Sequence, residues 1–143
     1  MIMNKDEYIS TRLDDQIAWY EKESNWNQKC YKIMRSVEIV VAAFIPIFTF
    51  YITSSNPNMK IFVGALAVIV VIVSSLLALF KFQEHWLQYR TTAESLKHHK
   101  FLYLTKTSPY DKDNAFTLFV SSTEGLISKE NSNWSSFVKE KAK

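Results

Sequence analysis

The sequence Ile61-Phe-Val-Gly-Ala-Leu-Ala-Val-Ile-Val-Val-Ile-Val-Ser-Ser-Leu-Leu-Ala-Leu-Phe80 contains no charged residue over 20 positions. A second stretch, 39–59, is uncharged over 21 positions and ends directly before Lys60. An α-helix rises about 1.5 Å per residue, so about 20 residues cross a hydrocarbon core of about 30 Å. Because the polar segment Ser54-Ser-Asn-Pro-Asn-Met59 separates the two apolar runs, the sequence predicts a transmembrane helical hairpin.

Composition and length restrict the rest of the fold. The chain has 143 residues, enough for one domain, and its two glycines and three prolines are too few for the turns of an all-β protein. We therefore predict an all-α membrane protein. Its two-transmembrane hairpin would consist of long helices that extend into a cytoplasmic helical bundle.

The expected organisation is a single domain, 1–143, made of six segments. A helix should end before Ser108-Pro109, and Asp113 or Asn114 could cap a last helix that starts near Ala115. In chain order we expect a cytoplasmic amphipathic helix (4–36), transmembrane helix 1 (37–53), an external turn (54–60), transmembrane helix 2 (61–80), a cytoplasmic helix (81–106) and a C-terminal cytoplasmic helix (113–140).

Positive charges indicate the orientation of the hairpin. Lysine and arginine residues flank the outer ends of both apolar stretches, whereas Lys60 is the one positive residue in the turn. The positive-inside rule then places both termini in the cytoplasm. We expect a two-span protein of the cell inner membrane, with membrane lipid as its surroundings.

Heptad-like spacing predicts how the helices pack outside the membrane. The first helix carries one seam with steps of 4, 3, 4, 3, 4 and 3, and a second apolar stripe lies beside it, which favours a bundle with more than one neighbour. A matching seam in 81–106 should pack against the first. The seams and the stripe are, in order, Leu13, Ile17, Tyr20, Ser24, Asn27, Tyr31 and Met34; Phe82, Trp86, Tyr89, Ala93 and Leu96; and Trp19, Trp26, Cys30, Ile33 and Val37.

The second apolar stretch has a face of small residues. Gly64, Ala67, Val71, Ser74 and Ala78 follow one another by 3, 4, 3 and 4 positions. Small residues allow close approach of helices in lipid, so this face should pack on the first span or on a neighbouring subunit. The alternative places Ser74 and the adjacent Ser75 in the wall of a pore.

Two features of the first apolar stretch concern gating and the membrane boundary. Pro46 lies near its middle and removes one helical hydrogen bond, so Pro46 is a candidate hinge. Arg35, Glu38 and Lys81 should lie level with one another at the cytoplasmic boundary. They could form a cluster that neutralises Glu38 between helices, or Glu38 could form a ring at the mouth of an oligomeric pore and favour cations.

The sequence offers little for catalysis or for nucleic acid. Glu94 and His98 share a helix face and could hold a metal weakly, but a closed site needs three or four ligands. HExxH, CxxC and GxSxG motifs are missing from the sequence, and no polybasic run occurs. We expect no enzyme activity, no catalytic, cofactor-binding or metal-binding residues, no cofactor, and no nucleic acid polymer as a partner.

The order of these signatures resembles a known family of membrane proteins. The residues that carry the resemblance are Arg12-x-x-x-Gln16-Ile17-x-Trp19-Tyr20, Ser24, Asn27, Tyr31, Arg35, Ile45-Pro46, Trp86-x-x-Tyr89-Arg90, Glu94-x-Leu96-Lys97, Pro109-Tyr110, and Glu124 to Trp134. The chain is similar over nearly its whole length to the SLATT superfamily, the SMODS and SLOG-associating two-transmembrane effectors, in its standalone two-span bacterial branch.

This resemblance implies a function. Such proteins are expected to be homo-oligomeric membrane effectors in bacterial anti-phage or nucleotide-signalled defence, which open a pore or disrupt the membrane when a sensor fires. Two spans cannot enclose a water-filled path, so a pore requires a tetramer or a larger assembly, with a signalling protein or a nucleotide ligand as its trigger. The alternative is a non-conducting membrane scaffold whose cytoplasmic bundle docks a partner protein.

Overall fold

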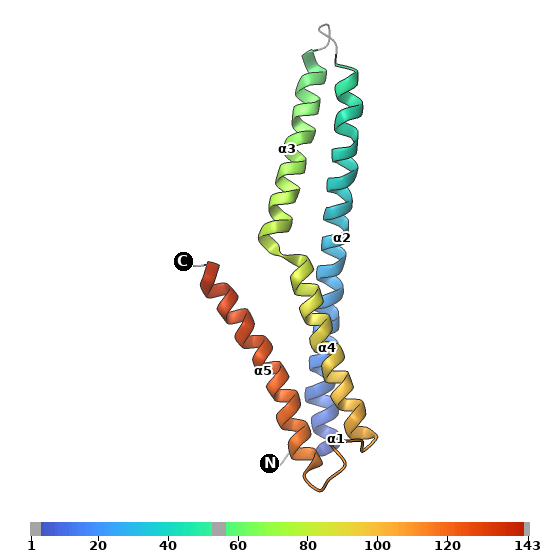
Figure 1. Cartoon of the computed structure of the whole chain (residues 1–143), viewed down its shortest axis with the longest axis vertical. Coiled ribbons are helices and arrows are strands. Elements are labelled where there is room, and N and C mark those ends of the chain that lie inside the picture. Colours follow the sequence, from blue (N-terminus) through green and yellow to red (C-terminus); the bar gives the residue numbers. More distant parts are fainter. Residues whose placement is uncertain (1–3, 53–56, 142–143) are drawn as a thin grey trace. The chain divides into compact units, whose positions relative to one another are not determined.

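A computed structural model of the chain describes residues 4–52 and 57–141 (Figure 1). Both described ranges are helical and contain no β-strand, as the all-α prediction requires. The elements are α1 (Lys5–Glu7), the π-helical segment η1 (Tyr8–Leu13), α2 (Asp14–Phe50), α3 (Pro57–Phe80), α4 (Phe82–Leu104) and α5 (Ala115–Lys141).

The residues form two compact units. The terminal unit combines Met1–Ser24 with Leu87–Lys143, and the hairpin unit is the continuous segment Asn25–Trp86. Each unit therefore contains a part of α2 and a part of α4, and each is described by itself below.

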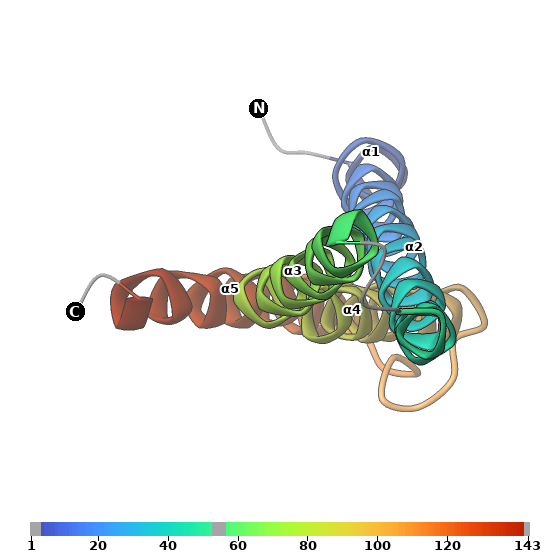
Figure 2. The ribbon, with the colours of Figure 1, turned by 90° about the horizontal axis from the view of Figure 1, so that it is seen from above.

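In the hairpin unit, α3 lies beside the second half of α2 in both ribbon views (Figures 1 and 2). The Ser74 hydroxyl of α3 donates a hydrogen bond to Glu38 of α2, and the rings of Phe48 and Phe62 meet edge to face with centroids 5.4 Å apart. Pro46 lies inside α2, which continues to Phe50. The predicted external turn, 54–60, lies outside the described residues over 54–56, and α3 begins at Pro57.

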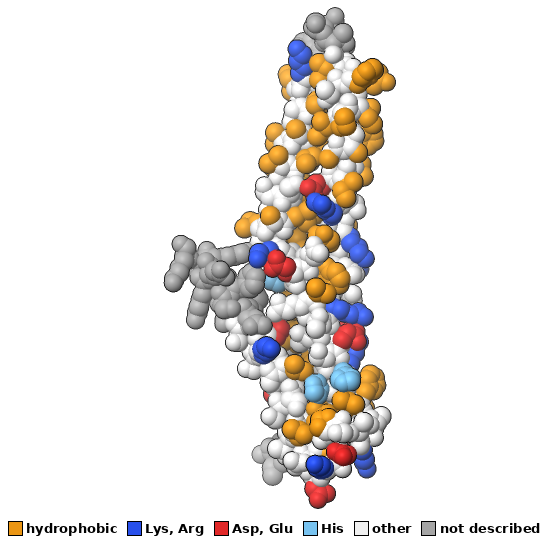
Figure 3. Space-filling model, viewed as in Figure 1, with side chains coloured by type: hydrophobic (Ala, Val, Ile, Leu, Met, Phe, Trp, Pro, Cys, Tyr) orange, Lys and Arg blue, Asp and Glu red, His pale blue; other side chains and the backbone are white. Residues whose placement is uncertain are grey.

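Hydrophobic side chains are spread over the face of this hairpin that Figure 3 shows. Large apolar residues such as Phe50, Ile61 and Val71 are exposed, and no described residue of α3 is buried. Two helical stretches of the chain, Lys5–Phe50 and Asn58–Leu104, are long and apolar enough to cross a membrane. Such a surface is larger than a protein in water normally exposes.

The predicted continuation of the second apolar helix into the next helix is interrupted at Lys81. Its φ of 49° is left-handed, so α3 ends at Phe80 and α4 begins at Phe82. The Lys81 N–H still donates to the Leu77 carbonyl at 3.2 Å, whereas its own carbonyl accepts from the N–H groups of Glu84 and His85. One residue therefore closes one helix and opens the next.

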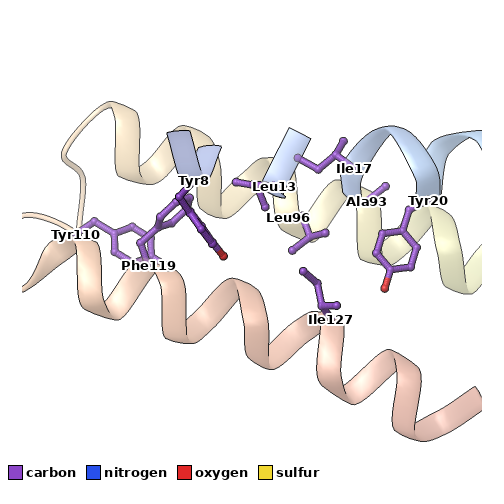
Figure 4. Packing of buried hydrophobic residues seen from close by; sticks show 9 residues of the cluster. All are labelled: Tyr8, Leu13, Ile17, Tyr20, Ala93, Leu96, Tyr110, Phe119 and Ile127. Atoms are coloured by element: carbon purple, nitrogen blue, oxygen red, sulfur yellow. The ribbon is translucent and has the colours of Figure 1, made fainter. Parts of the chain in front are cut away.

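The terminal unit contains the buried core of the protein, in which the two predicted seams pack together (Figure 4). Leu13, Ile17 and Tyr20 come from the first seam, and Ala93 and Leu96 come from the second. At the end of this core, Phe119 of α5 stacks on Tyr103 with ring centroids 4.4 Å apart. The buried members are Tyr8, Leu13, Ile17, Tyr20, Ala93, Leu96, Tyr110, Phe119 and Ile127.

A π-helical turn at the start of the chain also serves this core. Tyr8 and Leu13 are both buried although they are five residues apart, and five α-helical residues would place them about 140° apart around the axis. A π-helix has more residues per turn, with bonds from residue i to i+5, and brings the two side chains onto one side. Further along, α5 starts beside α4 and diverges from it toward its C-terminal end (Figures 1 and 2).

Candidate functional site at the end of the apolar helices

A polar groove lies in the hairpin unit at the end of the two apolar helices. Its volume is about 400 Å³. The groove brings together Arg35, Glu38 and Lys81, which the sequence singled out for this boundary, and adds Ser74 from the small-residue face. The complete lining is Tyr31, Arg35, Glu38, Ser74, Leu77, Ala78, Lys81, Gln83 and Glu84.

Glu38 is the central side chain of the groove. Arg35, one turn earlier on α2, donates from Nη1 to Glu38 Oε2 at 2.7 Å. Ser74 of α3 donates its hydroxyl to the other oxygen, Oε1. Each carboxylate oxygen thus has its own donor, and the half-buried side chain is fixed between two helices. Charge-assisted hydrogen bonds of this kind are about twice as strong as neutral ones.

Lys81 lines the same groove, where its Nζ lies 3.3 Å from Glu84 Oε2. The groove thus contains two cationic and two anionic side chains and carries no net charge. Such a site can hold water, a small ion or a polar group at the edge of an apolar region.

The other predicted site residues lie outside the groove, except for Ala78, which lines it. Ser75 is exposed and donates to the carbonyl of Val71 in its own helix at 2.7 Å. Gly64 and Ala67 are exposed too, and a Cβ at Gly64 would meet nothing within 4 Å in the described chain. The small-residue face therefore does not contact α2 at Gly64, whereas further along the same face Ser74 donates to Glu38 of α2.

The predicted helix-packing aromatic residues divide between the two units. In the terminal unit, the ring of Trp19 meets those of Tyr20 and Tyr89 edge to face, with centroids 5.0 and 5.7 Å away. Tyr20 is buried, while Trp19 remains half exposed. Trp86 belongs to the hairpin unit and is half-buried.

The terminal unit contains a buried carboxyl group that sequence reasoning missed. Glu130 of α5 is 7% exposed, and it accepts hydrogen bonds from the Tyr20 hydroxyl at 3.4 Å and from Gln88 Nε2 at 3.3 Å. Burial raises the pKa of Glu130, and burial beside this carboxylate also raises the pKa of Tyr20. A signal existed in the sequence, because Glu130 continues the apolar steps from Phe119 through Ile127 on one face of α5.

A second polar contact ties the start of the chain to α5. Arg12 donates from Nε and from Nη2 to the two carboxylate oxygens of Glu124, each at 3.1 Å. The hydroxyl of Tyr8 also donates to Glu124 Oε1 at 3.0 Å. The hydrogen bond from Arg12 is the main cause that lowers the pKa of Glu124. Spacing gave no sign of this pair, since 112 positions separate its members.

Glu94 and His99, which lie in the part of α4 that was considered for weak metal binding, each contact another side chain. Glu94 pairs with Arg90 at 3.1 Å, and His99 Nδ1 lies 2.5 Å from the Tyr110 hydroxyl. Burial lowers the pKa of His99. Across residues 4–52 and 57–141, no group of three or more His, Cys, Asp or Glu side chains could hold a metal ion.

Comparison with known proteins gives a family. No curated protein and no solved structure matches the chain. A family model described as "Protein of unknown function (DUF4231)" matches residues 15–117, a range that includes α2 from its second residue, all of α3 and α4, and every residue of the polar groove. The chain belongs to the DUF4231 family.

Proposed function

We propose that the protein is a homo-oligomeric membrane effector that forms a pore. The observation that carries the proposal is the polar groove around Glu38, which lies where two exposed apolar helices end. In the proposed arrangement α2 and α3 cross the cell inner membrane, both termini lie in the cytoplasm, and Glu38 lies at the cytoplasmic boundary.

The pore requires several copies. Two helices cannot surround a water-filled path, because a closed wall needs several helices side by side. Four or more copies are therefore expected around one axis. A carboxylate repeated at the mouth of such an assembly would attract cations. Arg35 and Ser74 would then set the position of that carboxylate through their hydrogen bonds to Glu38.

The biological role follows from the resemblance to the SLATT superfamily. The proposed effector acts in bacterial anti-phage or nucleotide-signalled defence: it opens occasionally by itself, and a signal from another protein or from a nucleotide makes it open more often. The terminal unit, with its own buried core, is the part that would receive this signal.

The test is conductance of the full chain in planar bilayers. Unitary currents with cation selectivity are expected for the wild type, and Glu38→Gln should reduce the selectivity because it removes the charge from the mouth. Glu94→Gln makes the same chemical change on α4 outside the groove and should leave selectivity unchanged. Silent bilayers with an intact oligomer, or equal selectivity in all three proteins, would contradict the proposal.

A non-conducting scaffold is the second candidate. It is favoured by Phe101 and Leu104, two exposed apolar side chains near the end of α4 that a partner protein could cover. In that case the reconstituted protein carries no current, and Phe101→Glu abolishes capture of a specific partner. Currents carried by the Phe101→Glu variant as well as by the wild type would favour the pore.

A further inference from the structure

We propose that copies of the chain pair through one face of α2. This face, called the exposed stripe, consists of Trp26, Cys30, Ile33, Val37, Val40, Phe44 and Ile47 of α2, together with Tyr51, which directly follows the last residue of the helix. The inference rests on the proposed function in one respect: it takes α2 to enter the membrane in the same direction in every copy.

The stripe keeps a strict spacing along α2. Its steps are 4, 3, 4, 3, 4, 3 and 4 residues, which is the heptad pattern that packs one helix against another. Seven of the eight side chains are exposed, with Trp26 at 64% and Ile33 at 63%, and Cys30 is half-buried. None of the eight stripe positions is occupied by a charged residue.

The face next to the stripe packs on another helix of the same chain. Each residue that follows a stripe residue is half-buried, from Asn27 to Ile52. On that neighbouring face, Glu38 bonds to Ser74 and Phe48 meets Phe62, so it is the face that packs on α3. One residue corresponds to about 100° of helix rotation, so the stripe lies beside the α3 contact and remains uncovered.

Lipid can cover the part of the stripe that follows Val37, but not the part between Trp26 and Val37. Trp26 precedes Val37 by eleven residues, about 16 Å along the helix axis. Lys29, Lys32 and Arg35 lie between them, so this part of α2 lies at the level of charged side chains. A tryptophan and an isoleucine exposed to water there need a protein surface to cover them.

A second copy of the chain fits this surface by direction, area and charge. Helices inserted the same way are parallel, and parallel helices pair equivalent heptad positions. The exposed area of the stripe is on the order of 800 Å² per copy, close to the roughly 800 Å² per partner of a standard interface. In a parallel pair the position across from Lys29 is Met34 of the second copy, so no like charges oppose each other there.

Cys30 makes the arrangement measurable, because it is the one cysteine of the chain and belongs to the exposed stripe. In a parallel pair it lies next to Cys30 of the second copy. Copper phenanthroline with oxygen as the oxidant removes one proton and one electron from each thiol and joins them as a disulfide. A covalent dimer is therefore expected from the wild type in nanodiscs under non-reducing conditions.

Two matched variants locate the contact. Cys30→Ser combined with Ile33→Cys keeps a cysteine on the stripe and should also give the dimer. Cys30→Ser combined with Lys32→Cys moves the cysteine to an exposed position off the stripe and should not. Dimers formed equally well from Lys32→Cys, or none from Cys30 and Ile33→Cys, would overturn the inference.

A disruption experiment separates this inference from the proposed function. Trp26→Glu should lower the mass of the assembly in native mass spectrometry, whereas Asn25→Glu, at an exposed neighbouring position, should not. An intact oligomer with Trp26→Glu, together with no Cys30 dimer, would overturn the stripe as the interface and leave the oligomeric effector standing. A wild type that is monomeric in nanodiscs would overturn both.

Discussion

Replacing Phe119 by alanine tests the packing of the terminal unit. Phe119 is 0% exposed and its ring touches those of Tyr103, Tyr110 and Tyr8 at centroid distances of 4.4, 5.7 and 6.2 Å. Truncating a buried phenylalanine costs about 3–5 kcal/mol through lost transfer energy and the cavity left behind. Aromatic pairs each add about 0.5–1.5 kcal/mol beyond buried area, so we expect the upper half of that range.

The matched control is Phe101→Ala, the same chemical change on α4 at a side chain that is 61% exposed. Full burial of such a side chain contributes about 1.5–3 kcal/mol, and the smaller buried fraction of Phe101 reduces its loss to about 1 kcal/mol. The two variants should therefore differ by about 3 kcal/mol in the opening free energy of the terminal unit.

Hydrogen exchange of the full chain in nanodiscs measures this difference. Every 1.4 kcal/mol changes an equilibrium about tenfold, so Phe119→Ala should speed exchange in α5 about a thousandfold relative to the wild type and about a hundredfold relative to Phe101→Ala. Peptides from α3, which belongs to the hairpin unit, should exchange as in the wild type. Equal acceleration by Phe119→Ala and Phe101→Ala would refute the assignment of Phe119 to the core.

Three further predictions concern charge and backbone. Burial raises the pKa of Glu130, so the folded chain keeps a proton that the unfolded chain loses, and stability falls as pH rises from near 4.5 through the folded pKa. Glu130→Gln should flatten this pH dependence of the thermal unfolding temperature, and an unchanged slope would contradict the prediction. Arg12→Ala should cost less than about 1 kcal/mol at neutral pH, because the side chains of Arg12 and Glu124 are 43% and 38% exposed; since Arg12 lowers the pKa of Glu124, the loss should disappear when titration to lower pH protonates Glu124. Lys81→Gly should stabilise the junction of α3 and α4 by about 1 kcal/mol, because glycine adopts a left-handed φ without strain, whereas Lys81→Val should destabilise it in the same unfolding assay.

The regular part of the fold was predictable because it depends on local pattern. The first charge-free run begins within α2 and the second lies within α3, and the expected start near Ala115 is the start of α5. The heptad seam of the first helix identified Leu13 and Tyr20 as buried residues. Each of these features needs only the residues within a few helical turns.

The features that sequence reasoning missed depend on distant residues or on single backbone angles. The turn at Lys81 is one left-handed residue between two helices, and nothing in its side chain marks it, because lysine has no special preference for that conformation. The pair of Arg12 with Glu124 joins segments at opposite ends of the chain. In the polar groove, Glu38 and Ser74 were each singled out by position, but their hydrogen bond depends on how α2 and α3 are aligned along each other.

The mass of the full chain in nanodiscs, measured by native mass spectrometry, tests the central claim most directly. The protein is proposed to be a homo-oligomer whose copies together line a membrane pore. This predicts one closed assembly of four or more copies. A monomer or a dimer under the same mild conditions would leave too few helices to enclose a path and would contradict the claim.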